Sequence, residues 1–427
     1  MTYTTLNDLY LSESSGLHSR RLDLLLLAPN CDGTDVGEAW RAHKWVEALA
    51  SHANVTLLTM QRQGRTSVAF QLPNVEVVTM PEPSFVNERL NAMLKISYVK
   101  YFSFVRTWLQ DALAQGRQFD VGHQITPAAL RYPTPFLGFG IPYILGPMAG
   151  SLKTPKGFIR ECNGAPWYTK LRDLDTVRLR YDPLLRRSFR EAAMVIGVAS
   201  YVGDLLSCIN ADNFVIHGEL GIDDLAPLPI QKSIAIGRLK LLHVGRGVRT
   251  KGLRDIVRAM AALKDLKGIT LDSAGAGAEI EICRKEAKLL GVSDRITFHG
   301  HLSREEIEQL YAASDLFVFP SFREPSGRVI SEALRWGLPI LTTKVGGPGA
   351  IVDSTCGFKV AADNPDQLST DLSNSLREIY QHVFWLIPMR IGARNKVGKD
   401  GLWKNKAQLM LNAYDAVLQK QLSKGAA

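Results

Sequence analysis

The sequence of 427 residues predicts an α/β protein with two doubly wound, Rossmann-like domains built on parallel sheets. Short apolar runs alternate with stretches of helical apolar spacing, as in successive βαβ units. This rhythm begins twice, at Leu22 and again near Lys240, and a chain this long exceeds one ordinary core. The expected parts are a tail (1–20), a first domain (21–222), a linker (223–238), a second domain (239–402) and a last helix (403–427).

The composition predicts a soluble globular protein of the cytoplasm. Mean hydropathy is −0.03, and apolar runs such as Leu24–Ala28 are far too short to span a membrane. Met1–Gly16 is polar and lacks the pattern of a signal peptide. Cysteines occur without any Cys-x-x-Cys pair, which favours free thiols in a reducing compartment. They are Cys31, Cys162, Cys208, Cys283 and Cys356.

The net charge of +9 is unevenly placed along the chain. Residues 1–225 hold 22 basic and 22 acidic side chains, so the whole excess lies beyond them. Within the neutral half, Lys153–Arg190 is locally basic. Basic patches suit polyanionic ligands, anionic lipid or nucleic acid. Because no zinc spacing, RNA-binding signature or helix-turn-helix stands out, we expect no nucleic acid partner and favour a diphosphate ligand or a lipid surface.

The first domain opens with a buried strand over Leu22–Ala28, a turn that contains Gly33 and Gly37, and a helix with Trp45 on its apolar face. The two glycines do not form a dinucleotide fingerprint, and turn geometry alone would account for them equally well. A second strand is expected over Val75–Thr79.

Residues 84–116 combine aromatic and basic side chains at helical spacing. The aromatic and apolar positions are Phe85, Leu90, Met93, Tyr98, Tyr101, Phe102, Phe104 and Trp108, and the basic ones are Arg89, Lys95, Lys100 and Arg106. Such a stretch can lie on a membrane surface. A helix whose apolar face joins the core while its basic residues are solvated is the more frequent arrangement, so both interpretations stay open.

A histidine is predicted at the ligand-binding edge of the first sheet. The strand Phe119–Gly122 ends at His123, and open α/β sheets bind ligands at the carboxyl ends of their strands. The ring could hydrogen-bond a sugar hydroxyl or a phosphate, or relay a proton; a purely structural role is the alternative. The next strand, Pro142–Leu145, leads into a loop from Gly146 to Gly150, whose glycines would allow close backbone approach.

No metal site is expected in the first domain. Asp173 and Asp175 form an Asp-x-Asp, but they lie in a charged helical run without the apolar strand that such a motif follows. The strands Met194–Ala199 and Asn213–His217 then complete the first half.

The second domain begins with a strand over Lys240–Val244 and a helix over Leu253–Leu263. Arg246 and Lys251 lie five positions apart around the turn between them, so both can point to one place at the end of the strand. A pair of cations there suits a diphosphate, because arginine bonds in bidentate fashion and lysine acts as a point charge.

The next units continue the βα order. Strands are expected over Ile269–Ala274 and Ile296–Gly300, and His301–Leu302 begins the following connection. Gly275-Ala-Gly277 lacks the third glycine of a dinucleotide motif because Ile280 stands there, so it is interpreted as a packing turn.

The stretch Leu316–Thr343 is the most informative part of the chain. A buried strand, Leu316–Phe319, precedes a loop with Glu324 and a helix from Gly327 or Arg328 to about Trp336 that carries Glu332. The carboxylates would be roughly 12 Å apart if all eight positions were helical, too far to share a proton. The N–H groups of Gly327, Arg328 and Val329 would favour an anion, so we expect an elongated ligand with central phosphates, such as a nucleotide sugar.

Glu-x7-Glu after Val-Phe-Pro-Ser, followed by Gly-Leu-Pro-Ile, resembles the donor-binding signature of the family 4 retaining glycosyltransferases. Members of that family have the GT-B fold, in which two Rossmann-like domains face each other across a cleft. The resemblance is specific over residues 239–360 and looser over 21–218. Pro325 and Ser326 replace the usual Gly-Phe of the motif, so the loop near the sugar is expected to be stiffer.

The resemblance implies a role for each of these positions. Arg246, Lys251 and the N-terminus of the Glu332 helix, with Ser326, would hold the leaving diphosphate without a metal. Glu324 would bind sugar hydroxyls and Glu332 ribose hydroxyls, while His301 and Leu302 would meet the nucleobase. His123 would orient the substrates; the cleft loops would be those of Gly33, Gly37, Gly146 and Gly150. The helix Trp403–Gln419 would cross back to the first domain, although packing on its own domain is as good an expectation.

The expected reaction is transfer of a hexose from a nucleotide-diphosphate sugar to a hydroxyl acceptor with retention of configuration. UDP-sugar is the first choice of donor and GDP-mannose the second, with no cofactor. The basic surface and aromatic helix permit a lipid-linked saccharide acceptor in polysaccharide assembly and contact with the inner face of the membrane. Two alternatives are a nucleotide-sugar epimerase of the same fold and a non-catalytic protein that binds nucleotide sugars or lipid.

Overall fold

The computed structural model describes residues 3–10, 20–83, 97–162, 174–209, 213–227 and 234–425. The chain divides into two compact units. The first comprises Met1–Ser151, Lys170–Glu219 and Trp403–Ala427, and the second comprises Leu152–Thr169 and Leu220–Leu402. The predicted first domain (21–222) includes Leu152–Thr169, but this segment belongs to the second unit. The C-terminal helix belongs to the first.

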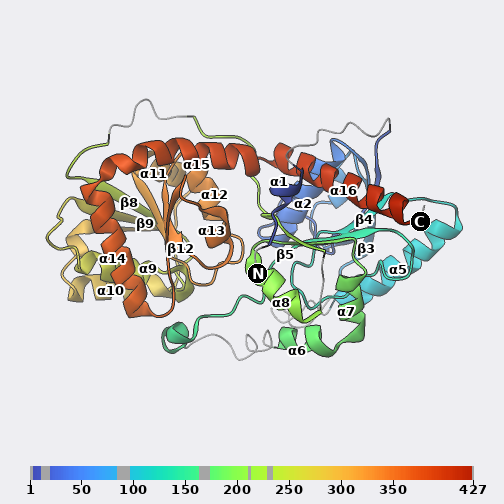
Figure 1. Cartoon of the computed structure of the whole chain (residues 1–427), viewed down its shortest axis with the longest axis horizontal. Coiled ribbons are helices and arrows are strands. Elements are labelled where there is room, and N and C mark those ends of the chain that lie inside the picture. The colour runs from blue at the N-terminus through green and yellow to red at the C-terminus, as the bar shows by residue number, and fades with distance from the viewer. Residues whose placement is uncertain are drawn as a thin grey trace. The chain divides into compact units, whose positions relative to one another are not determined.

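The first unit contains a seven-stranded parallel sheet in the order β3-β2-β1-β4-β5-β6-β7 (Figure 1). Its strands are β1 (Asp23–Leu27), β2 (Asn54–Gln61), β3 (Glu76–Pro81), β4 (Val121–Gln124), β5 (Tyr143–Met148), β6 (Met194–Gly197) and β7 (Phe214–Ile216). Its helices are α1 (Leu6–Tyr10), α2 (Glu38–Ala50), α3 (Val68–Gln71), α5 (Tyr98–Ala114), α6 (Leu174–Tyr181), α7 (Pro183–Arg190), α8 (Ser200–Leu206), η3 (Ser207–Ile209) and α16 (Trp403–Gly425).

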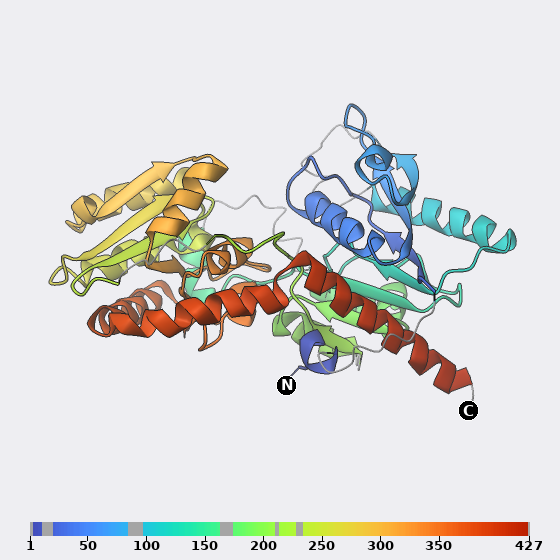
Figure 2. The ribbon, with the colours of Figure 1, turned by 90° about the horizontal axis from the view of Figure 1, so that it is seen from above.

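Helices cover both faces of this sheet, which explains the nearly continuous apolar strands. Leu24 and Leu26 of β1 face α2 and α16, whereas Leu25 and Leu27 face α5, α7 and α8. Helix α16 lies beside α2 (Figure 2), where the Trp403 ring meets the Trp45 ring edge to face at 5.4 Å between centroids. The last helix is therefore part of the core of the first unit.

The second unit contains a six-stranded parallel sheet in the order β10-β9-β8-β11-β12-β13. Its strands are β8 (Leu239–Val244), β9 (Ile269–Ala274), β10 (Ile296–Gly300), β11 (Leu316–Phe319), β12 (Ile340–Thr343) and β13 (Gly357–Val360). Its helices are η1 (Lys156–Cys162), η4 (Arg249–Lys251), α9 (Leu253–Ala261), α10 (Ala278–Leu289), η5 (Ser293–Arg295), α11 (Arg304–Ala313), α12 (Arg328–Arg335), α13 (Gly346–Ile351), α14 (Pro365–Gln381), η6 (Val383–Trp385) and α15 (Leu386–Asp400).

This second sheet is also covered on both faces. Figure 1 shows α9, α10 and α14 on one face and α11, α12 and α15 on the other, and two separate apolar clusters contain their buried residues. The strand order reverses between β8 and β11, whose pairing aligns Leu241 with Leu316. Open α/β sheets form ligand crevices beyond the carboxyl ends of the strands at such a reversal, which directs attention to the segments after β8 and β11.

The prediction of two parallel-sheet α/β domains is confirmed, and most strands fall within two residues of their predicted bounds. Two strand ends were predicted wrongly. Strand β4 continues to Gln124, so His123 lies inside it, and β5 continues to Met148, so Gly146 lies in a strand and not in a loop. Among the described residues, no helix is both long and apolar enough to cross a bilayer.

The described part of the aromatic stretch 84–116 begins just before helix α5. Tyr98, Tyr101, Val105 and Leu109 are buried against the first sheet, so this face of α5 belongs to the core. The guanidinium of Arg106 donates to the carbonyl oxygens of Pro135 and Leu137. The predicted positions Phe85, Arg89, Leu90, Met93 and Lys95 lie outside the described residues.

Candidate functional site

Lys251 ends the short turn η4 after strand β8, at the reversal of the second sheet. Gly252 follows it with φ +80° and packs so closely on Pro320 that a Cβ would collide with the Pro320 carbonyl oxygen. The Lys251 side chain is therefore held against the loop after β11. Only 8% of Lys251 is exposed, and its Nζ donates to Oε2 of Glu324.

Glu324 occupies the loop between β11 and α12, where its carboxylate faces a cation and two amides. Oε2 accepts from Lys251, and Oε1 accepts from the backbone N–H groups of Ser326 and Gly327 at 3.2 Å each. Burial alone would raise the pKa of Glu324, but the charge and hydrogen bond of Lys251, with the two amides, outweigh it and hold that pKa below its ordinary value. The carboxylate is thus fixed in its ionised form.

Helix α12 begins directly after this loop, with Gly327 as its N-cap at φ +79°. A second loop closes over the first, since the N–H of Gly347 donates to the carbonyl oxygen of Glu324 at 3.0 Å. Arg328 and Val329 open the helix, and Gly337 follows its C-cap Trp336 at φ +69°. The helix N-terminus, Lys251 and Glu324 therefore lie together, and the helix N-terminus and the lysine favour negative charge at this place.

Glu332, eight positions later on α12, has a more open environment. Its Oε1 accepts from Nε of Arg328 at 3.0 Å, and its Oε2 accepts from the Tyr311 hydroxyl at 3.4 Å. About a third of the Glu332 side chain is exposed, as is half of that of Arg328. This carboxylate can therefore exchange its arginine for a ligand hydroxyl more easily than Glu324 can release Lys251.

The remaining predicted donor-binding residues also follow strands of the second sheet. Arg246 comes two residues after β8 and is exposed, and none of the described acidic side chains forms an ion pair with it. His301, after β10, is exposed, while Leu302 packs partly into the core beside α11 and α12. The exposed cation and imidazole are available to a ligand at this edge.

His123 in the first unit does not lie where the sequence predicts. It is wholly buried within β4; its Nδ1 bonds the Tyr414 hydroxyl at 2.6 Å and its Nε2 the Gly146 carbonyl oxygen at 2.7 Å. Burial lowers the pKa of His123 to about 4, although the bond to Gly146 opposes that shift. The predicted exposure of His123 at the sheet edge was wrong, because this neutral ring ties β4 to α16 and β5.

The predicted loop glycines of the first unit are divided between two places. Gly33 and Gly37 flank the turn before α2, where Gly33 N–H donates to Gln71 Oε1 at 2.7 Å and Gly37 is the N-cap at φ +69°. Gly146 is buried in β5, whereas the N–H of Gly150 donates to the Tyr201 hydroxyl at 3.2 Å. Gly33 and Gly150 thus follow β1 and β5 at the carboxyl edge of the first sheet.

Asp175, the second aspartate of the Asp-x-Asp sequence that was not expected to bind a metal, has a structural role. The buried carboxylate of Asp175 accepts from Arg131 at 2.8 Å and from the Ser151 hydroxyl at 2.5 Å, while Asp173 lies outside the described residues. Within the described ranges, no three His, Cys, Asp or Glu residues are grouped as metal ligands would be.

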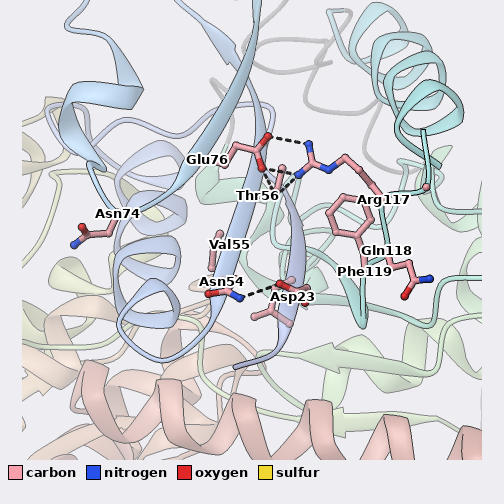
Figure 3. Close-up of a pocket in the computed structure, with 11 residues that line it drawn as sticks. Asp23, Asn54, Val55, Thr56, Asn74, Glu76, Arg117, Gln118 and Phe119 are labelled. Carbon is pink, nitrogen blue, oxygen red and sulfur yellow. Dashed lines mark hydrogen bonds and ion pairs between the residues drawn. The ribbon is translucent and has the colours of Figure 1, made fainter. Parts of the chain in front are cut away.

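A hollow of about 590 Å³ lies at the opposite edge of the first sheet (Figure 3). Asp23, Asn54 and Glu76, the first residues of β1, β2 and β3, line it. The Glu76 carboxylate accepts hydrogen bonds from Arg117 and from the Thr56 hydroxyl, and Asn54 donates to Asp23 at 2.9 Å. These mutual bonds, and the position at the amino ends of the strands, make this hollow a weaker candidate than the Lys251–Glu324 edge.

Comparisons with known proteins identify the family of this site. The model of the group 1 glycosyl transferases matches residues 229–378. Glycogen synthase of Mycobacterium tuberculosis is 35% identical over 180 residues, 42% of each chain. The lipopolysaccharide glucosyltransferase WaaG of Escherichia coli is 32% identical over 148 residues, 34% of this chain and 39% of that one. The chain thus matches less than half the length of either relative.

Solved structures extend the likeness in fold to nearly the whole chain. Sucrose-phosphate synthase from Thermosynechococcus elongatus superimposes with a TM-score of 0.63 at 18% identity, covering 94% of this chain and all of that one. Residues 229–378 thus match the group 1 glycosyl transferases, and the chain as a whole has the GT-B fold.

Proposed function

We propose that the protein is a retaining glycosyltransferase that takes a hexose from a nucleotide-diphosphate sugar. The observation that carries the proposal is the joint placement of Lys251, Glu324 and the N-terminus of α12 at the reversal of the second sheet. It supplies a cation and backbone donors for a diphosphate beside a fixed carboxylate for sugar hydroxyls. A long ligand would then extend along α12 to Glu332.

In the proposed reaction, the bond between the anomeric carbon and the diphosphate oxygen breaks while the acceptor hydroxyl oxygen attacks on the same face. The acceptor proton passes to a phosphate oxygen, so no protein base is needed. Lys251, Arg246 and the α12 amides stabilise the charge that develops on the diphosphate. Glu324 orients the sugar, and Glu332 takes the ribose hydroxyls.

UDP-sugar is the proposed first donor and GDP-mannose the second. The acceptor is a hydroxyl of a saccharide; the names of the two relatives, one a glycogen synthase and one a lipopolysaccharide glucosyltransferase, support this class. A lipid-linked saccharide at the inner face of a membrane fits the basic excess of the chain, +9 in all.

The proposal is tested by incubating the purified protein with labelled UDP-sugars and GDP-mannose, with and without oligosaccharide acceptors. Transfer, or slow hydrolysis with retained configuration, supports it. An isomerised sugar would indicate an epimerase, and tight binding without turnover a non-catalytic nucleotide-sugar protein. Because cations of the chain hold the diphosphate in this scheme, turnover should survive EDTA; complete loss with EDTA would contradict the scheme.

Matched variants separate a damaged site from a damaged fold. Glu324→Gln and Lys251→Ala should each lower turnover at least tenfold, as the loss of one transition-state contact does. The controls are Glu378→Gln and Lys285→Ala, which change exposed residues of α14 and α10 in the same way. Equal losses in the controls and the site variants would contradict the assignment.

A further inference from the structure

The segment η1 packs against the two loops that carry Lys251 and Glu324, although its flanking sequence belongs to the first unit. The Phe158 ring of η1 is fully buried and stacks on Phe322 at 3.9 Å between centroids. Gly157 fits so tightly against Asp363 that a Cβ would collide with its carbonyl oxygen. The segment η1 is therefore an integral, packed part of the second unit.

Arg249, the first residue of η4, is fixed beside these two stacked rings and forms an arginine–aromatic cluster with them. Its guanidinium carbon lies 5.3 Å from the Phe158 centroid and 5.2 Å from the Phe322 centroid. It donates to both oxygens of Asp255 at 2.6 and 2.8 Å, and its Nε donates to Glu161 at 2.7 Å. Only 6% of Arg249 is exposed, so this cation serves the architecture of the loops and is not available to a ligand.

This arginine–aromatic cluster joins the turn that carries Lys251 to the loop that carries Glu324. Arg249 lies two residues before Lys251, and Phe322 lies two residues before Glu324. Between them, the Thr250 carbonyl oxygen accepts from the Ser321 hydroxyl at 2.8 Å and from Phe322 N–H at 3.2 Å. A shift of this arginine–aromatic cluster would therefore be expected to change the spacing between the Lys251 ammonium and the Glu324 carboxylate.

Glu161 is the carboxylate of η1 that bonds to Arg249 of this arginine–aromatic cluster. It bonds Arg249, and its second oxygen lies 3.0 Å from NH2 of Arg258 on α9. Both arginines also have carboxylates of their own, Asp255 for Arg249 and Glu286 for Arg258. Loss of Glu161 would therefore leave both arginines paired with their other carboxylates and Phe158 in the core, and would remove only the ion pairs that tie η1 to Arg249 and Arg258.

We propose that Glu161 is a positioning residue of the donor site: by clamping η1 to Arg249 and Arg258, it fixes the turn of Lys251 and the loop of Glu324 at the spacing that the diphosphate sugar requires. The proposal rests on the function proposed above. Neither Glu161 nor Arg249 touches the sugar in this scheme; both act through Lys251 and Glu324.

The test compares Glu161→Gln and Glu161→Asp with the control Glu281→Gln, which alters an exposed carboxylate of α10 that lies 3.5 Å from Arg284. Because small displacements of positioned groups cost up to about a hundredfold, we expect Glu161→Gln to raise KM for the donor and Kd for UDP or GDP about tenfold. Glu161→Asp should restore part of the affinity, and Tm should stay within a few degrees of wild type.

Hydrogen exchange decides the proposal independently of activity. In Glu161→Gln, peptides covering 249–252 and 321–327 should exchange faster, while peptides of β8 and β9 keep wild-type rates. Unchanged exchange in those two loops, or wild-type donor affinity, would overturn the proposal. If the wild-type protein binds neither UDP nor GDP, the proposed function is contradicted. The exchange rates of the two loops would still show whether Glu161 holds them in place. If Glu161→Gln does not fold, Arg258→Lys, which keeps the charge but loosens the contact with Glu161, gives the same comparison.

Discussion

The Lys251–Glu324 pair allows stability and activity to be separated in one experiment. Removing one partner of a buried ion pair typically costs about 3–5 kcal/mol, because the other charge is left unpaired. Glu324 would keep its two backbone amides after Lys251→Ala, so we expect the lower value, about 3 kcal/mol of unfolding free energy. In the double variant Lys251→Ala/Glu324→Gln the unpaired charge is gone, and about 1–2 kcal/mol should return.

Activity should behave in the opposite way. Lys251→Ala loses a contact to the leaving diphosphate, and one lost transition-state donor costs about a hundredfold to a thousandfold in kcat. The double variant regains stability but not the cation, so its kcat/KM should stay at or below that of Lys251→Ala. Recovery of stability without recovery of turnover is the distinguishing result.

The assay combines urea unfolding with initial rates on the same preparations. Since the pKa of Glu324 is below its ordinary value, the stability that the pair contributes is present above about pH 4.3 and is lost as the pH falls through the folded-state value. The stability difference between wild type and Lys251→Ala should therefore shrink in acid. A Lys251→Ala variant with wild-type stability, or a double variant that regains turnover, would refute the reasoning.

Three further predictions concern the scaffold around the site. Gly327→Ala should cost about 1–2 kcal/mol of unfolding free energy and raise the donor KM, because φ is +79° and a Cβ would press on Pro348 at 3.2 Å; urea unfolding and donor kinetics check it. His123, with a pKa of about 4 against an ordinary 6.5, takes up a proton on unfolding below that ordinary value. His123→Gln should therefore lose about 2 kcal/mol less stability than wild type between pH 7 and pH 5, and equal losses in urea titrations would disprove this. Trp403→Ala should cost about 3–5 kcal/mol, seen as a lower Tm, because its ring is buried against Trp45.

The second sheet and the proximity of Lys251 to Glu324 at its carboxyl edge could be predicted because their signals are local. Strands β8 and β11 are apolar runs closed by Gly245 and Pro320, and Gly337 has the left-handed conformation expected of a residue that ends a helix. Lys251 and Glu324 each follow such a strand within a few residues. The parallel pairing of β8 with β11 then brings them together.

The role of His123 could not be predicted, because it depends on a partner 291 residues away. Tyr414 on the last helix accepts or donates the hydrogen bond that makes His123 part of the core, and no spacing in the sequence links the two. Glu161 and Arg249 are 88 residues apart and were missed for the same reason. Long-range packing, and not local propensity, decides whether a polar residue after a strand faces a ligand or the interior.

The sequence does not distinguish the two carboxylates of the Glu-x7-Glu motif, but the structure places them in different environments. Glu324 is fixed by a buried cation and two amides, so moving it would break three charge-assisted contacts at once. Glu332 is bound to a half-exposed arginine on its own helix, a contact of the kind typically worth about 0.3–0.5 kcal/mol. A ligand hydroxyl can displace Arg328 at little cost, whereas at Glu324 it must join a preformed network. The carboxylate held by three contacts thus suits the end of the proposed ligand where geometry controls the reaction, and the more exposed one suits the end where only affinity is needed.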